Sequence, residues 1–357
     1  VLDEGTKIAG VFTQNKFCAA PVVVAKEHIS RKESGSFIRA LIINTGSANA
    51  GTGEEGITHT RSICSELARL LGCDVSQVLP FSTGVIMERL PVEKIISNLP
   101  KVVANLKPDN WHSAAQAILT TDTVPKAITK KILLGGSTVT ITGVAKGSGM
   151  ICPNMATMLS YLATDAAISQ PLLKKMIHNV ADNSFNRITV DGDTSTNHSF
   201  ILIATGRAGN LEIFDQESSE YKELQDALTE VAVHLAKEIV KDGEGATKFI
   251  SIQVDEGIDS SECLSVAYKV AESLLVKTAF TASDPNWGRI IAAIGNSNIR
   301  DLDIHKIDVY IDDICIVNNG ERSKTYSEDK GKKVMRQNEI ILRIKLRRGT
   351  FLSLIHI

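Results

Sequence analysis

The sequence predicts a layered α/β fold. Short runs rich in β-branched residues, with lengths typical of strands, are interspersed with longer segments whose apolar residues recur every three to four positions. The two kinds of segment do not follow a strict strand–helix–strand order, and no internal repeat is visible. Of the 357 residues, 43% are hydrophobic and 22% charged. These are ordinary globular values, and the length allows two domains or one large layered domain.

The individual elements follow from local patterns. Residues 137–142 predict a strand because they are rich in β-branched side chains. Ile63, Leu67 and Leu71 recur at helical spacing and predict a helix over 57–72. By the same criteria, strands are expected over 37–44, 77–81, 137–142, 248–254, 306–316 and 338–347. Helices are expected over 57–72, 92–106, 171–184, 218–241 and 260–278.

Charge and cysteine content exclude several classes of protein. The 39 basic and 41 acidic residues give a net charge of −2, which leaves no excess positive charge for binding nucleic acid. No apolar run reaches the ~18 residues that a membrane-spanning helix needs. The six cysteines and eight histidines show no metal-binding spacing, so we expect no metal site and reduced thiols. No leader pattern is visible, and we expect a cytoplasmic protein, or one of an organellar matrix if a transit segment is missing.

Two glycine-rich loops are candidates for phosphate binding. Gly51, Gly53 and Gly56 form a G-x-G-x-x-G pattern, but it lies too far from the preceding strand for a dinucleotide site, which favours a structural turn. Lys146 precedes the glycines of its loop, the reverse of the P-loop order, so it can equally hold a carboxylate. A non-catalytic nucleotide- or metabolite-binding protein remains an alternative.

Two further segments are ambiguous when taken alone. Asp191 and Asp193 begin a calcium-loop pattern, but the twelfth position is the apolar Leu202, which favours a structural turn. Thr157 opens an apolar run, where threonine is usually a packed strand residue. A threonine with a free N-terminal amine is nevertheless a known variant of the catalytic triad.

Taken together, the motifs resemble the ornithine acetyltransferase (glutamate N-acetyltransferase) family of arginine biosynthesis. The blocks that carry the resemblance are AGVFT at 9–13, NTGSANA at 44–50, STGVI at 82–86, TTDTVPK at 120–126, KGSGM at 146–150, PNMATML at 153–159, SFN at 184–186, VDGDTSTN at 190–197 and DPNWGR at 284–289. They follow the family order across nearly the whole chain.

The resemblance implies a self-processing enzyme. The precursor is cut between Ala156 and Thr157 into an α chain, 1–156, and a β chain, 157–357. The enzyme moves the acetyl group of N2-acetyl-L-ornithine to L-glutamate, and some members also use acetyl-CoA as a substrate. No cofactor is implied. The implied fold is similar to that of N-terminal-nucleophile hydrolases with its own topology, assembled from two α and two β chains.

The resemblance also assigns the catalytic residues. Thr157 is the nucleophile, and its own freed α-amine is the base, with a pKa suited to proton transfer near neutrality. The hydroxyl of Thr83 and the backbone N–H of Gly84 form the oxyanion hole. Without the resemblance, this pair reads as a turn at the end of a strand.

Four residues are implied to bind substrate. They are Thr123, Lys146, Glu244 and Thr157, with Thr121 as the substitute for Thr123 if the register slips. Glu244 is the expected partner of the ornithine ammonium. On sequence alone it reads as a solvated residue after a helix end.

Two departures from the family pattern stand out. Residues 348–357 do not match the strand-rich tail that supplies an Asn and a Thr or Ser to the substrate site, so we expect a truncated, atypical end. Met87 stands where a glycine is common. A further alternative keeps the architecture but lets water accept the acyl group, which gives a self-processing aminopeptidase or amidohydrolase.

Overall fold

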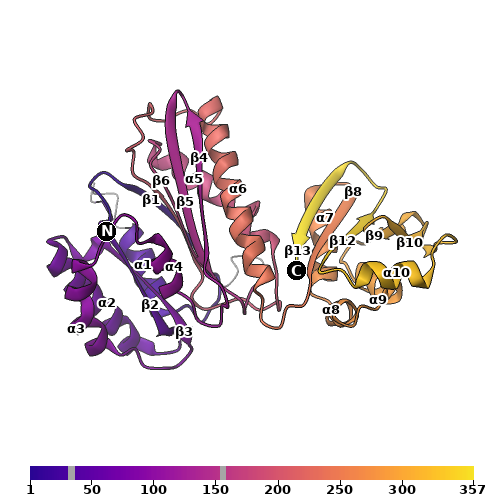
Figure 1. Cartoon of the computed structure of the whole chain (residues 1–357), viewed down its shortest axis with the longest axis horizontal. Helices are drawn as coiled ribbons and strands as arrows, with labels where there is room; N and C mark the ends of the chain where they lie inside the picture. Colours follow the sequence, from indigo (N-terminus) through magenta and orange to yellow (C-terminus); the bar gives the residue numbers. More distant parts are fainter. Residues whose placement is uncertain (31–36, 153–157) are drawn as a thin grey trace. The chain divides into compact units, whose positions relative to one another are not determined.

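The computed structural model describes residues 1–30, 37–152 and 158–357. They divide into two compact units (Figure 1). The first unit comprises Val1–Asn186 and Asp193–Glu244, and the second comprises Arg187–Gly192 and Gly245–Ile357. Each unit has its own sheets and its own hydrophobic core.

A five-stranded sheet, in the order β1-β7-β6-β5-β4, forms the centre of the first unit. Its strands are β1 (Lys7–Phe12), β4 (Lys126–Leu134), β5 (Ser137–Lys146), β6 (Leu159–Thr164) and β7 (Ser199–Ala204). Only β6 and β7 run parallel to each other. Helix α6 (Ser219–Lys241) packs on β4 and β5, and α5 (Gln170–Asp182) packs on β1 and β7 (Figure 1). The two helices cover this sheet because each buries one apolar stripe at helical spacing.

A second, two-stranded sheet lies in the same unit. Strands β2 (Ala40–Ser47) and β3 (Val78–Val85) run parallel and are connected through helix α2 (Gly53–Leu71). Helices α2 and α3 (Val92–Ala104) pack on one face around Leu67 and Leu99. Two more helices complete the unit, α1 (Ala20–Ser30) and α4 (Trp111–Ala117).

The other face of this small sheet packs against the five-stranded sheet. Phe81 of β3 meets Tyr161 of β6 edge to face, with ring centroids 5.2 Å apart. Apolar residues of both sheets join them in one core. Helices, sheet, sheet and helices therefore form successive layers, and the predicted layered α/β class is confirmed.

The second unit is built on a six-stranded sheet in the order β11-β10-β9-β12-β8-β13. Its strands are β8 (Phe249–Gly257), β9 (Asp308–Ile311), β10 (Ile314–Asn318), β11 (Glu321–Arg322), β12 (Glu339–Lys345) and β13 (Phe351–His356). Its helices are α7 (Ser260–Ala271), α8 (Leu274–Thr281), α9 (Trp287–Gly295) and α10 (Glu328–Met335). Helix α7 packs on β8 and β13 and closes one side of the core.

Two predicted elements of this unit are wrong in detail. The single strand expected over 306–316 is the hairpin of β9 and β10, and its turn places Asp312 at a φ of +49°. Asp tolerates this left-handed conformation better than most residues, which lets the chain reverse here. The single helix expected over 260–278 is broken, because the side chain of Ser273 accepts a hydrogen bond from the Val276 N–H and starts a new helix.

The atypical end of the chain is part of the sheet. β13 pairs antiparallel with β8, and its residue Ile355 is fully buried. Among the described residues, no helix combines the length and the apolar character needed to cross a bilayer.

Candidate active site

Lys146, the last residue of β5, is the centre of a polar cluster in the first unit. Its side chain is buried, and its ammonium donates to the hydroxyls of Thr120 (2.5 Å) and Thr83 (3.3 Å). A carboxylate oxygen of Asp122 lies 3.3 Å from the same nitrogen. Burial lowers the pKa of Lys146, and the carboxylates of Asp122 and Glu244 partly oppose this effect. The Lys146 ammonium therefore has three polar partners, the hydroxyls of Thr120 and Thr83 and the carboxylate of Asp122.

A second buried lysine extends the cluster into an alternating chain of charges. Lys126 lies 2.7 Å from Asp122 and 2.6 Å from Asp242. Burial alone would raise the pKa of Asp122, but the ammoniums of Lys146 and Lys126 and the Gly147 N–H hold it below its usual value. The pKa of Asp242 is also below its usual value: burial would raise it, but Lys126 and the hydrogen bonds from Thr123 lower it. Because each buried charge has a partner, the network rigidifies this end of β5.

The predicted oxyanion residues lie at the end of β3, beside Lys146. Thr83 faces Lys146 while the neighbouring Ser82 points the other way and donates to Asn44 at 2.5 Å, as alternation along a strand requires. Gly84 has a φ of +136°, and a Cβ there would lie 2.3 Å from the carbonyl carbon of Gly46. Only glycine fits, so the strand end carries no side chain at this point.

The three threonines of 120–123 are separated by the fold. Thr123, the predicted substrate ligand, is bound through its hydroxyl and its N–H to Asp242. Thr121 hydrogen-bonds the hydroxyl of Ser148 at 2.7 Å. Thr120 alone of the three contacts Lys146. The sequence alone does not single out Thr120, Asp122 or Lys126, because a block of adjacent polar residues gives no local signal of which side chain faces inward.

Glu244 approaches the same loop from the end of α6. Its N–H donates to the Ser148 carbonyl at 2.8 Å, and a Cβ on Gly149 would lie 2.8 Å from a Glu244 carboxylate oxygen. The structure thus brings Thr83, Gly84, Lys146 and Glu244 into one region. The predicted cleavage residues Ala156 and Thr157 lie outside the described residues.

Neither glycine-rich loop is arranged for phosphate. In the loop before α2, a Cβ on Gly56 would clash with the Thr52 side chain, and Glu54 and Glu55 in the first turn of the helix repel an anion. In the other loop, the Gly147 N–H already donates to Asp122 at 2.6 Å. A structural turn accounts for the first loop, and carboxylate binding by Lys146 of the second stays a prediction.

The aspartate-rich segment at 190–197 is anchored through its backbone. The carbonyls of Thr194 and Ser195 accept hydrogen bonds from Asn15 (2.7 Å) and Thr13 (2.6 Å). Across the described ranges, no group of three or more His, Cys, Asp or Glu side chains could hold a metal ion. These contacts support the interpretation of the segment as a structural turn.

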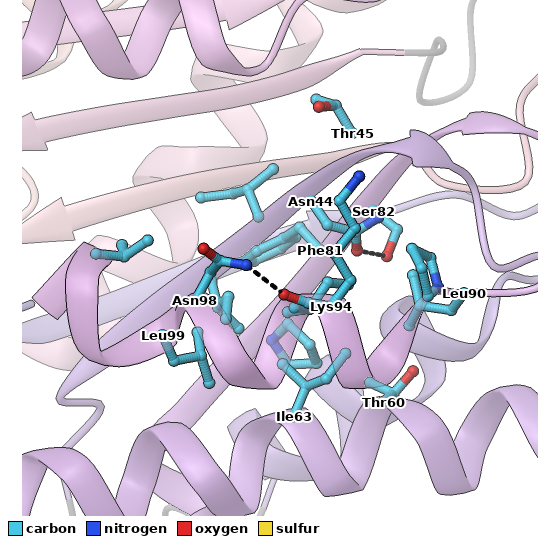
Figure 2. Close-up of a pocket in the computed structure, with 16 residues that line it drawn as sticks. Asn44, Thr45, Thr60, Ile63, Phe81, Ser82, Leu90, Lys94, Asn98 and Leu99 are labelled. Atoms are coloured by element: carbon cyan, nitrogen blue, oxygen red, sulfur yellow. Dashed lines mark hydrogen bonds between the residues drawn. The ribbon is translucent and has the colours of Figure 1, made fainter.

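A cavity of about 360 Å³ lies between the β2–β3 sheet and α3. Figure 2 shows Asn44 and Ser82 hydrogen-bonded on its wall, with Lys94 and Asn98 contributed by α3. Its lining is mostly apolar and does not include Lys146. The cavity is therefore separate from the polar cluster.

Comparisons with known proteins agree with the motifs. The arginine biosynthesis bifunctional protein argJ from Bacillus halodurans is 35% identical, with a TM-score of 0.53 over 56% of this chain and 93% of that chain. The ornithine acetyltransferase from Mycobacterium tuberculosis, solved with ornithine, is 28% identical over 42% of this chain and 92% of that chain, with a TM-score of 0.34. An L-aminopeptidase D-Ala-esterase/amidase from Ochrobactrum anthropi, described as a variant of the Ntn hydrolase fold, is 13% identical over 57% of this chain and 66% of that chain, with a TM-score of 0.32.

The model of the ArgJ family matches residues 1–355. This match covers nearly the entire chain, including both units and the polar cluster around Lys146. The chain therefore belongs to the ArgJ family.

Proposed function

We propose that this chain is an acetyltransferase of arginine biosynthesis that moves the acetyl group of N2-acetyl-L-ornithine to L-glutamate through an acetyl ester on Thr157. Membership of the ArgJ family supports acetyl transfer in this pathway. The similarity to the arginine biosynthesis bifunctional protein argJ from Bacillus halodurans supports the same reaction class.

Maturation comes first in the proposed sequence of steps. One water molecule is consumed as the peptide bond between Ala156 and Thr157 is cut, which leaves a carboxylate on Ala156 and an amine on Thr157. An intact threonine hydroxyl is a poor nucleophile and needs a base close by. The freed amine, with an ordinary pKa of about 7.7–8.0, can accept the hydroxyl proton near neutrality.

Two acyl transfers then follow. The hydroxyl oxygen of Thr157 attacks the acetyl carbonyl carbon and gives its proton to the α-amine of Thr157. The amide bond breaks, and ornithine leaves with this proton. The amine of glutamate attacks the acetyl ester, N-acetylglutamate forms, and the hydroxyl regains its proton. The donor product leaves before the acceptor reacts, which is the ping-pong pattern of covalent catalysis.

The contact between Lys146 and Thr83 is the observation that carries this proposal. The Lys146 ammonium donates to the Thr83 oxygen, so the Thr83 hydroxyl hydrogen is directed elsewhere and remains available as a donor. A hydroxyl that accepts from a cation is also a stronger donor. Together with the Gly84 N–H it can stabilise the oxyanion that forms in both transfers.

Substrate recognition uses the charges around this donor. The Lys146 ammonium is a point charge suited to a substrate carboxylate. Glu244, packed over Gly149, is suited to the side-chain ammonium of ornithine. Thr120 accepts a hydrogen bond from the Lys146 ammonium, so it replaces Thr123 as the candidate for substrate contact.

Three finer points belong to the proposal. Acetyl-CoA can serve as an alternative acetyl donor, and no further cofactor is required by the chemistry. The mature enzyme assembles from two α and two β chains. We place the reaction in the cytoplasm or an organellar matrix, since free thiols such as those of the six cysteines persist under reducing conditions.

Intact mass and a denaturing gel test the maturation step. Two fragments that meet between Ala156 and Thr157 are expected from the wild type, and one uncut chain from Thr157→Ala. Cleavage of Thr157→Ala at the same bond would show that the nucleophile is misassigned.

The transfer itself is tested with N-acetylornithine alone and with glutamate added. Without glutamate, we expect one equivalent of ornithine and a mass gain of one acetyl group on the fragment that begins with Thr157. With glutamate, turnover continues and N-acetylglutamate accumulates. Steady release of acetate without glutamate would instead identify an amidohydrolase.

A further inference from the structure

Asn197 lies just before the start of β7 and connects it to the strand that carries the oxyanion residues. Its side-chain N–H₂ donates to the carbonyl of Ala48 at 2.6 Å and to the carbonyl of Ser82 at 2.8 Å. The Ser82 carbonyl belongs to the peptide unit that immediately precedes Thr83. Asn197 is buried, and its own oxygen accepts from the Thr196 hydroxyl at 2.5 Å, so the amide is fixed in this orientation.

His198, the next residue, connects the start of β7 to the start of β6. Its Nδ1 accepts a hydrogen bond from the N–H of Met158 at 3.2 Å, and the Ser199 N–H donates to the Met158 carbonyl at 3.1 Å. Both backbone groups of Met158 are therefore held by residues 198–199. Met158 directly follows Thr157, the proposed nucleophile, in the sequence.

The His198 ring is suited to this single task. Nδ1 can accept only in the neutral ring, and complete burial lowers the pKa of His198 to about 3. The remaining proton is then on Nε2, which is buried and has no hydrogen-bond partner among the described residues. An unpaired buried N–H group lowers stability, and a leucine of similar size would carry no such group. The contact with Met158 is the benefit that offsets this cost.

We propose that Asn197 and His198 form a positioning pair, in which Asn197 holds the peptide before Thr83 and His198 holds Met158, the residue that follows Thr157 in the sequence. Because the two residues are adjacent in the chain, one backbone segment contacts both the peptide before Thr83 and the residue that follows Thr157 in the sequence. The inference rests on the proposed function, because it assigns the pair a role in acyl transfer and in self-cleavage.

Two substitutions at His198 separate positioning from simple packing. His198→Leu exchanges the unpaired Nε2–H for an unpaired Met158 N–H, so we expect a Tm within a few degrees of wild type. Self-cleavage and kcat should fall by about 10- to 100-fold, because a misplaced nucleophile loses alignment. His198→Asn keeps an oxygen acceptor near the Nδ1 position and should restore both rates, although its smaller side chain lowers the Tm.

Asn197→Asp is the companion variant. It keeps the shape of the side chain but removes both donors and places a carboxylate against two carbonyls. The rate of Thr157 acetylation should fall about 10- to 100-fold, with a small change in KM, because the oxyanion donor moves while the substrate charges stay in place.

Matched controls are present in the same unit. His28 is also buried and contacts a backbone carbonyl, that of Val78, at 2.7 Å. Asn179 donates to Gln225 at 3.1 Å, on α5. His28→Leu and Asn179→Asp should lower the Tm without changing the rates of cleavage or acetylation.

The outcomes distinguish this inference from the proposed function. If wild type is neither cut nor acetylated on Thr157, the proposed function fails. If wild type is active and His198→Leu and Asn197→Asp match it, the positioning pair is wrong. Equal losses in His198→Leu and His198→Asn would also overturn it, since packing alone would then explain them. Should His198→Leu fail to fold, His198→Gln, which moves the acceptor away from Nδ1, replaces it in the comparison.

Discussion

The ammonium nitrogen of Lys146 lies 3.3 Å from the hydroxyl oxygen of Thr83, although 63 positions separate the two residues in the chain. This contact connects the last residue of β5 to the end of β3, and so connects the two sheets of the first unit. The Thr83 hydroxyl accepts from Lys146 in this contact, so its own hydrogen is available for donation elsewhere.

Thr83→Val tests the donor role of this hydroxyl. The substitution keeps the branched shape but removes the oxygen, so we expect kcat to fall by about 10²- to 10³-fold with a small change in KM. Thr83→Ser keeps the hydroxyl and should stay within about tenfold of wild type. Equal activity in Thr83→Val and wild type would remove Thr83 from the oxyanion hole.

The proposed role of Lys146 predicts an alkaline limit on activity. The ammonium binds a carboxylate only while protonated, and burial lowers its pKa. The proton is therefore lost at a lower pH than the ordinary value of about 10.4. We expect KM for glutamate to rise as pH increases toward 10, and Lys146→Met to abolish this dependence along with most of the activity. A KM that is flat to pH 11 would contradict this role.

Asp122→Asn should weaken both function and stability. The carboxylate raises the pKa of Lys146 against the effect of burial. Without it, the alkaline rise in KM moves to lower pH. The side chains of Asp122 and Lys126 are completely buried. Removing the carboxylate leaves Lys126 with Asp242 alone and Lys146 without its close carboxylate, which costs up to about 3–5 kcal/mol. Urea unfolding measures the loss. Asp301→Asn should change stability little, because the Asp301 carboxylate is exposed and its partner Arg348 keeps Glu262.

His198 makes the fold sensitive to acid. Its pKa is about 3 in the folded protein, against about 6.5 when exposed. Between these values the unfolded chain binds more protons, so the free energy of unfolding decreases as pH falls from 6.5 toward 3. His198→Asn removes this contribution, and its Tm should decline less steeply over this range. Parallel Tm curves for the two proteins would contradict the assignment.

The two fragments of the mature enzyme should stay together under native conditions. β4 and β5 precede the predicted cut and β6 follows it, yet β5 and β6 pair antiparallel, with Lys146 opposite Leu159. β1, also before the cut, pairs with β7 after it. We expect one native species on size exclusion and two bands on a denaturing gel. Separation of the fragments without denaturant would contradict this sheet order.

Met87→Gly should stabilise the protein. Met87 has a φ of +67°, in the left-handed region that costs other residues about 1–2 kcal/mol. Glycine removes this strain but adds about 0.4–1 kcal/mol of unfolded-state entropy. The net gain is about 1 kcal/mol or less, measured as a higher Tm, whereas Met87→Ala keeps the strain and should show none. The structure thus gives a physical reason for a glycine at this position.

Elements were predictable where the signal is local. The helix predicted over 218–241 is α6 at Ser219–Lys241, since its apolar stripe is continuous and the Ser218 side chain caps its start. The single strand predicted over 306–316 was wrong because Asp312, at which the chain reverses, is a weak signal inside an apolar run. The single helix predicted over 260–278 was wrong because Ser273, which caps a new helix, is an equally weak signal. Both errors concern boundaries within elements of the correct type.

The sequence by itself determined the α/β class, the family blocks and the residue types of the site, because periodicity and motifs are properties of neighbouring residues. Only the tertiary structure decided that Thr120, rather than Thr123, contacts Lys146, and that Asp122, Lys126 and Asp242 form one buried network. These contacts depend on how β3, β5 and the end of α6 pack together. Packing over long separations sets the distances between charges, and no local pattern in the chain specifies those distances.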